Sequence, residues 1–136
     1  MTHRQMPFLP VLGRVMLAAL FLLSGFDKLM DPASTKAYIA SAGLPLPDIA
    51  YLVAVAVEVG LGLALLLGYQ TRIAAAVIAA FTVAAAIGFH ADFADGNQMN
   101  HFMKNIATAG GLLYVVAYGA PHFSLDALLA RRRKTA

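Results

Sequence analysis

The sequence predicts an all-α membrane protein in which four transmembrane helices form one bundle. Of its 136 residues, 60% are hydrophobic and 12% are charged, and the mean hydropathy is +0.72, far from the balance of an ordinary soluble domain. Four apolar segments approach the ~20 residues that a helix needs to cross a hydrocarbon core. No Ser-rich or charge-rich linker divides the chain, so residues 1–136 are interpreted as a single domain.

The predicted spans follow one another with short connections. Their approximate bounds are 8–30, 49–68, 73–89 and 102–120. The first segment could instead be a secretory signal, but its apolar part is long and no small-x-small cleavage site follows it directly. We therefore interpret it as a membrane span.

The distribution of charge predicts that both termini are cytoplasmic. Arg4 precedes the first span, Arg72 opens the third, and residues 131–134 form a basic tail. Asp92 and Asp95, by contrast, lie between the third and fourth spans. The positive-inside rule places the basic ends in the cytoplasm and the acidic connection outside. The net charge of +3 comes largely from the tail, which favours contact with anionic lipid over nucleic acid.

Two short interfacial helices are predicted outside the spans. An Asp-Pro pair at 31–32 and Gly43 bracket residues 33–42, which matches the usual start and end signals of a helix. Ser124 as a cap and Asp126 in the first turn, followed by leucines at helical spacing, predict a short amphipathic helix before the basic tail. The first helix would lie on the outer surface and the second on the inner surface.

Glu58 is an acidic residue that the sequence places near the middle of the membrane. It lies ten residues after Asp48, and at ~1.5 Å per residue this puts it about 15 Å below the outer surface of a ~30 Å core. A carboxyl group that faces lipid there costs on the order of 2.5 to 3.5 kcal/mol. We therefore expect Glu58 to face the bundle interior, protonated or paired. Gly60, Gly62 and Gly68 on the same helix would admit a neighbouring backbone or a flat ligand.

Lys28 is the predicted partner of Glu58, because Cα–Cβ bonds tilt toward the N-terminus of a helix. The first span begins inside, so Lys28 leans down into the membrane, whereas the second begins outside, so Glu58 leans up. The remaining gap in depth is about 10 Å, comparable to the combined reach of the two side chains. A direct pair is feasible, as is one bridged by water or a ligand.

Further polar side chains are expected in the outer half of the bundle. They are Ser24 and Asp27 on the first span, His90 at the end of the third, and His101, Lys104, Asn105 and Thr108 at the start of the fourth. Arg14 and Arg72, near the inner ends, are interpreted as snorkelling anchors. His90, Asp92 and His101 have the spacing of no defined metal site, and both histidines lie too near the boundary for a two-histidine haem. We therefore expect neither metal nor haem.

The outer polar residues suit the head-group of a quinone, which has a flat ring, two carbonyl acceptors and an apolar tail. Lys28 or Lys104 and His90 could donate hydrogen bonds, and Glu58, the candidate catalytic residue, could pass a proton. The other candidate ligand-binding residues are Ser24, Asp27, Asn105 and Thr108. The chain contains no cysteine, which excludes a thiol relay within it, so redox chemistry would need a borrowed cofactor.

Glycines and intramembrane charges recur in a particular order along the chain: Arg14, Ser24-Gly25-Phe26-Asp27-Lys28, Gly43-Leu44-Pro45, Glu58, Gly62, Gly68, Arg72, His90, Lys104-Asn105 and Gly110-Gly111. This order, from about Leu12 to Asp126, resembles the DoxX family of small bacterial inner-membrane proteins. The resemblance implies a four-helix fold. It also implies a link to redox chemistry, since some relatives are described as membrane subunits of thiosulfate:quinone oxidoreductases or as partners in oxidative-stress complexes.

These observations are compatible with two alternative functions of different classes. In the first, the chain is a quinone-interacting subunit of a membrane oxidoreductase and is not catalytic on its own. In the second, it is a non-catalytic scaffold or small-ligand binding protein whose intramembrane charges fix helix packing. A transporter is a third interpretation, but four short spans leave little room for alternating access without oligomerisation. The expected partners are membrane lipid, a soluble or membrane redox protein and further copies of the same chain.

Overall fold

The structure is a computed structural model that describes residues 6–135, and within this range it is helical and contains no strand. The helical elements are α1 (Phe8–Met30), α2 (Pro32–Ser41), α3 (Pro47–Val55), the π-helix η1 (Ala56–Leu61), α4 (Gly62–Leu67), α5 (Thr71–Phe89), α6 (Gly96–Tyr118) and α7 (Leu125–Thr135). Because α3, η1 and α4 follow one another without a break, they form one helical rod. The all-helical prediction is confirmed.

Three helices are long and apolar enough to cross a membrane: α1, the α3–η1–α4 rod and α5. They correspond to the first three predicted spans. The fourth predicted span, 102–120, lies within α6 except for its last two residues, and α6 begins earlier, at Gly96. Its first half carries His101, Lys104 and Asn105, which make this helix less apolar than the other three.

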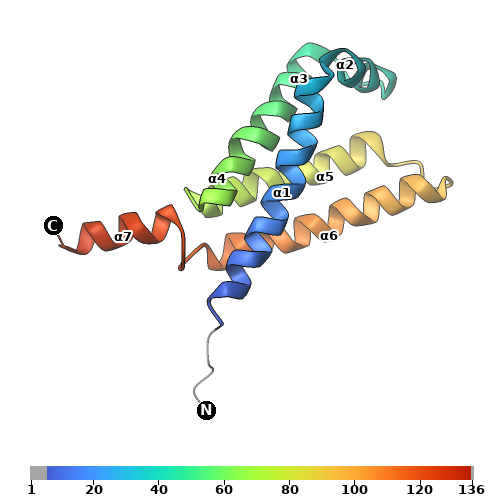
Figure 1. Ribbon diagram of the computed structural model, residues 1–136. Coiled ribbons are helices and arrows are strands. Elements are labelled where there is room, and N and C mark those ends of the chain that lie inside the picture. The colour runs from blue at the N-terminus through green and yellow to red at the C-terminus, as the bar shows by residue number, and fades with distance from the viewer. Residues whose placement is uncertain (1–5, 136) are drawn as a thin grey trace.

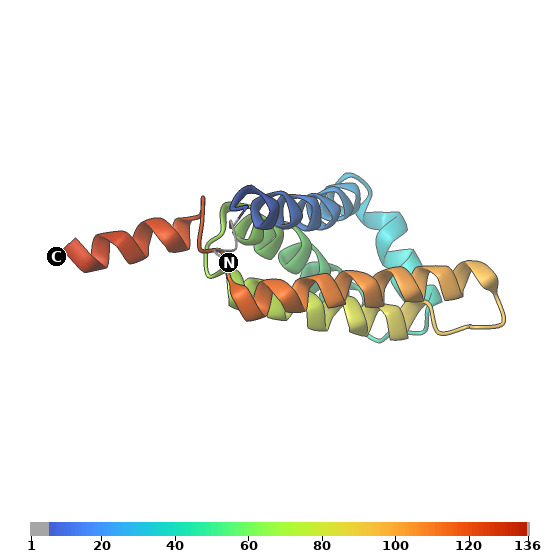
Figure 2. The ribbon, with the colours of Figure 1, turned by 90° about the horizontal axis from the view of Figure 1, so that it is seen from below.

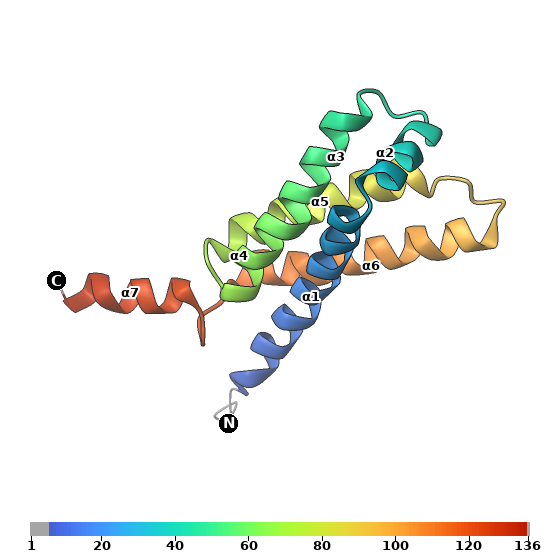
Figure 3. The same ribbon diagram turned by 45° about the horizontal axis from the view of Figure 1, so that its top comes forward.

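The long helices form two antiparallel pairs. The α3–η1–α4 rod returns beside α1, and α6 returns along α5 (Figures 1 and 2). The two pairs are inclined to each other, and the middle of the rod contacts α5 (Figure 3). α7 extends away from both pairs, at the end of the molecule where α5 begins and α6 ends (Figure 1).

The core between the pairs is built mainly from small and aliphatic side chains. Its buried members are Ala18, Phe21, Val57, Leu65, Ala75, Ile78, Ala79, Ala109 and Leu112. Alanines at these positions let helices approach closely, which is how membrane helices gain packing contacts without a hydrophobic driving force between them. Large apolar side chains such as Met16, Leu23 and Ile73 point outward instead, as expected for surfaces in contact with lipid.

The helix predicted over residues 33–42 is α2, shifted by one residue. Asp31 is its N-cap and accepts a hydrogen bond from the Ser34 amide at 3.1 Å, and Pro32 occupies the first turn. The Tyr38 ring stacks on Phe89 with 5.3 Å between centroids, so α2 lies over the end of α5. The helix between the first two spans thus packs against the third span.

Candidate functional site

Lys28 and Glu58 form a direct ion pair between α1 and η1. The Lys28 Nζ lies 2.9 Å from Oε2 of Glu58 and donates a hydrogen bond to Oε1 at 3.0 Å. Ser24, one turn earlier in α1, donates to the same Oε1 at 3.2 Å and accepts from the Lys28 ammonium at 2.8 Å. Of the two arrangements expected from the sequence, direct and bridged, the structure has the direct one.

The two members of the pair differ in burial. The Glu58 side chain is 7% exposed and the Lys28 side chain 26%. A lone carboxylate at such a depth would be strongly destabilising, and the ammonium with the Ser24 hydroxyl offsets that cost. Both carboxylate oxygens of Glu58 thus contact the Lys28 ammonium, Oε1 at 3.0 Å and Oε2 at 2.9 Å. The site therefore has a buried carboxylate paired with a partly exposed cation.

Glu58 occupies a π-helical turn, and Gly25 of α1 packs directly against that turn. A Cβ atom at Gly25 would lie 2.6 Å from Cγ2 of Val59 and 3.0 Å from Cβ of Glu58, so only glycine allows this approach. The π-turns of proteins occur frequently at functional sites. Of the glycines expected to admit a neighbour, Gly62 packs against Leu22, whereas Gly60 faces open space.

Tyr51 also belongs to the site, although the sequence analysis did not find it. Its ring is buried, and its hydroxyl donates a hydrogen bond to the Lys28 carbonyl at 3.3 Å. This carbonyl lies in the last turn of α1, where it lacks an intrahelical donor. The sequence signal that could have identified Tyr51 is its place near the start of the second span, opposite the last turn of the first span.

His90 lies in a second polar group, between the end of α5 and the start of α6. Its Nδ1 is 2.7 Å from Oε1 of Gln98, and its ring stacks on that of His101 with 4.9 Å between centroids. Gln98 was not among the candidate residues. No group of three His, Cys, Asp or Glu side chains within residues 6–135 is arranged to hold a metal ion.

The remaining candidate residues are not joined to the ion pair by any described contact. Thr108 donates a hydrogen bond to the Lys104 carbonyl within α6 at 2.8 Å, and the Lys104 side chain is exposed. Asn105 is half-buried, and Asp27 is exposed on α1. The reason is topological, since α6 packs along α5 and meets α1 only slightly. The structure thus brings together Ser24, Lys28 and Glu58 but leaves the candidates from α5 and α6 apart.

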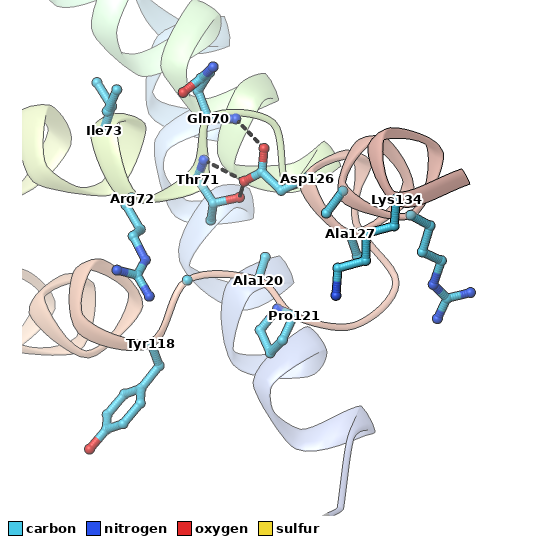
Figure 4. Close-up of a pocket in the computed structure, with 13 residues that line it drawn as sticks. Gln70, Thr71, Arg72, Ile73, Tyr118, Ala120, Pro121, Asp126, Ala127 and Lys134 are labelled. Carbon is cyan, nitrogen blue, oxygen red and sulfur yellow. Dashed lines mark hydrogen bonds between the residues drawn. The ribbon is translucent and has the colours of Figure 1, made fainter. Parts of the chain in front are cut away.

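Asp126 at the start of α7 forms a separate polar cluster with the first residues of α5. Its carboxylate accepts from the Gln70 and Thr71 amides, both at 2.9 Å, and from the Thr71 hydroxyl at 2.6 Å (Figure 4). Burial of this carboxyl opposes ionisation, but the hydrogen bonds from Thr71 and Gln70 outweigh it, and the pKa of Asp126 lies below its usual value. Asp126 therefore caps α5 and fixes the start of α7.

Arg14 lies at the same end of the molecule but is not the snorkelling anchor that we expected. It is 5% exposed, and its Nη2 donates a hydrogen bond to the Phe123 carbonyl at 2.8 Å. The bond is possible because Gly68 lies beneath: a Cβ there would approach Arg14 Nη1 to 3.1 Å. The guanidinium thus anchors the connector before α7 instead of reaching water.

The fold and the buried ion pair define a small helical membrane protein that crosses the bilayer several times. The family model DoxX matches residues 9–91. The inner membrane protein YqjF of Escherichia coli (strain K12) is 35% identical over 125 residues, covering 90% of this chain and 92% of the relative. The inner membrane protein YphA of the same organism is 34% identical over 125 residues, covering 88% and 89%.

The chain therefore belongs to the DoxX family and is an integral inner-membrane protein. This confirms the resemblance that the glycines and intramembrane charges indicated. No solved structure matches the chain.

Proposed function

We propose that the chain is a quinone-interacting subunit of an inner-membrane oxidoreductase complex, with Ser24, Lys28 and Glu58 as its head-group site. The observation that supports this most directly is the Glu58 carboxylate, 7% exposed, paired with a Lys28 ammonium that is 26% exposed. Ionisable side chains inside membrane spans are costly and rare, and those present mark proton and substrate paths. A carboxylate that exchanges a proton with a ligand needs such a position.

The chemistry divides between the two charged groups. The Lys28 ammonium, 26% exposed, donates a hydrogen bond to a carbonyl oxygen that approaches from its open side. Glu58 lies behind it and holds or releases a proton, passing it through the Lys28 ammonium or the Ser24 hydroxyl that bind its Oε1. A bound quinone supplies the capacity to take up two electrons and two protons. Because the chain has no cysteine, the electrons come from a redox partner protein.

The proposed topology places this site in the outer half of the membrane. In this proposed topology, α6 is the fourth span of a four-helix bundle, and both termini are cytoplasmic. The basic residues Arg72 and 131–134 support this orientation, since all of them lie at the end where α5 begins and α7 follows α6. Lys28 then lies near the outer end of α1, accessible to a ligand that enters from the membrane.

A second candidate function is a non-catalytic scaffold, and a different observation favours it. Lys28 and Glu58 contact each other directly, and the Gly25 backbone lies against η1 without space for a side chain. A flat ring therefore has no room between α1 and η1 and must approach from the Lys28 side. In the scaffold function, the ion pair fixes the register of these two helices and binds no head-group.

Quinone retention separates the two functions. The protein is purified gently into nanodiscs, and mass spectrometry counts the quinone molecules per chain in the wild type and in Glu58→Gln. Asp92→Asn, which neutralises an exposed carboxylate in the connection between α5 and α6, is the matched control. We expect near-stoichiometric quinone in the wild type and the control and its loss in folded Glu58→Gln. No enrichment in any of the three would support the scaffold.

A further inference from the structure

A hollow of about 550 Å³ lies at the end of the molecule opposite the ion pair, where α5 begins, α6 ends and α7 passes (Figure 4). Three basic side chains line it: Arg72 of α5 and Arg131 and Lys134 of α7. Asp126 is its acidic residue, and the carboxylate oxygens are occupied by the Gln70 and Thr71 groups that they cap. The lining thus carries three positive charges against one negative charge, which suits an anion.

The helix that carries two of these cations, α7, is attached to the rest of the fold at its start. Asp126 fixes the start of α7 through its side chain and through its own amide, which donates to the Gly68 carbonyl at 2.9 Å. Arg14 holds the connector before α7 through Phe123. These bonds tie α7 to the first turn of α5, and Arg131 and Lys134 of α7 line the same hollow as Arg72. This differs from a flexible basic tail, which would attract anionic surfaces without forming a site.

Gly119 gives Arg72 its position at the edge of the hollow. A Cβ at residue 119 would lie 3.0 Å from Nε of Arg72, so the arginine crosses the end of α6 through space that a side chain would fill (Figure 4). The φ of Gly119 is +67°, which also favours glycine. An arginine guanidinium offers the paired donors that bind a phosphate group through two parallel hydrogen bonds.

A second hollow, of about 740 Å³, runs between α1 and α6 and is mostly apolar, with Arg14 as the charged residue of its lining. Gly13, Met16 and Leu20 of α1 and Tyr114 of α6 line it. Tyr118 and Gly119 line both hollows, so the charged one and the apolar one meet at the end of α6. α1 is apolar enough to span the membrane, so the groove along it lies among acyl chains, while the charged hollow lies at the level of the head-groups.

We propose that the two hollows together form a site for one anionic phospholipid. The phosphate binds Arg72, Arg131 and Lys134, and one acyl chain lies in the groove between α1 and α6. The site is separate from the quinone site and does not depend on it. The net positive charge of one hollow, the packing of Arg72 against Gly119 and the adjoining groove that shares Tyr118 and Gly119 are the features that match a molecule with a phosphate head and a hydrocarbon tail.

Native mass spectrometry of the full chain tests the head-group. The protein is released from nanodiscs that contain equal amounts of phosphatidylglycerol and phosphatidylcholine, and the lipids that remain bound are counted. We expect one phosphatidylglycerol on the wild type and a loss of about five-fold in its affinity in Arg72→Gln. Arg133→Gln removes the same charge from α7 but does not line the hollow, and it should retain the lipid. Equal loss in both variants, or equal retention of the two lipids, would overturn the proposal.

Two further arms test the groove and the source of the phosphate. A Cβ at Gly13 meets no atom within 4 Å, so Gly13→Leu should fold while its side chain fills the groove. We expect Gly13→Leu to weaken binding of the long-chain lipid; unchanged binding would refute the proposal that an acyl chain lies in the groove.

Glycerol 3-phosphate represents the free head-group, and we expect that it does not displace the lipid. Displacement at equal concentration would mean that the hollow binds soluble phosphate esters. If Arg72→Gln fails to fold, Lys134→Gln replaces it with the same expectation.

Discussion

The effects of removing the two charges of the Lys28–Glu58 pair should not add: the double variant should lose less stability than the two single variants lose together. Lys28→Met leaves the Glu58 carboxylate, 7% exposed, with only the Ser24 hydroxyl as a donor. Glu58→Gln leaves the Lys28 ammonium, which still binds Ser24 at 2.8 Å and reaches the surface. The two single substitutions are therefore not equivalent, and the lysine substitution is the more costly.

The magnitudes follow from burial. Breaking a fully buried ion pair by removing one partner costs about 3 to 5 kcal/mol. Because the Lys28 side chain is 26% exposed, we expect about 3 kcal/mol, the low end of that range, for Lys28→Met. For Glu58→Gln we expect about 1.5 kcal/mol, the scale of a hydrogen bond to a charged group. The double variant should cost about 2.5 kcal/mol, which gives a coupling energy of about 2 kcal/mol.

The assay is equilibrium unfolding in mixed micelles with increasing SDS, followed by far-UV circular dichroism, since the chain has no tryptophan. The Lys36–Asp48 pair, with 2.7 Å between Nζ and Oδ1 and side chains 40% and 78% exposed, serves as the control. Its double-mutant cycle should show no measurable coupling, because surface pairs are screened by water. Additive effects at Lys28 and Glu58, with coupling below about 0.5 kcal/mol, would refute the reasoning.

Two other predictions concern helix docking. Asp126→Asn should weaken the attachment of α7 to the start of α5. The pKa of Asp126 is lowered in the folded chain, so its carboxylate contributes its full stabilisation above the ordinary aspartate pKa of about 3.9. That stabilisation is lost as the pH falls below this value. The measurement is the rate at which α7 is cleaved by a protease across this pH range. The difference in protection between wild type and Asp126→Asn should shrink in acid. A difference that does not change with pH would contradict the role of Asp126 as the cap of α5. Gly25→Ala should cost about 1 to 3 kcal/mol through overlap with Val59, whereas Gly60→Ala, in open space, should be close to neutral in the same SDS unfolding assay. Equal effects at the two glycines would be inconsistent with close packing of α1 on η1.

Only one pair of the candidate site could be predicted from the sequence, because helix direction and depth are enough to bring two side chains together. Lys28 and Glu58 could be paired from helix direction and depth alone, since each side chain leans toward the other by the tilt of the Cα–Cβ bond. The distribution of the other polar groups could not be obtained in this way. His90 and Lys104 share a depth with Lys28, but depth does not say which helices are neighbours. Only the packing of α6 along α5 decided that these residues lie away from the ion pair.

The order of residues was sufficient to predict a helical chain embedded in the membrane, because apolar length and the cost of a buried charge depend on that order alone. It also determined the start of α2 and the presence of α7, whose capping signals are local. Two features could be seen only in the folded chain: Arg14 turns inward to Phe123, and Glu58 occupies a π-turn against Gly25. These features depend on how closely two helices approach, and that distance is fixed by side chains far apart in the sequence.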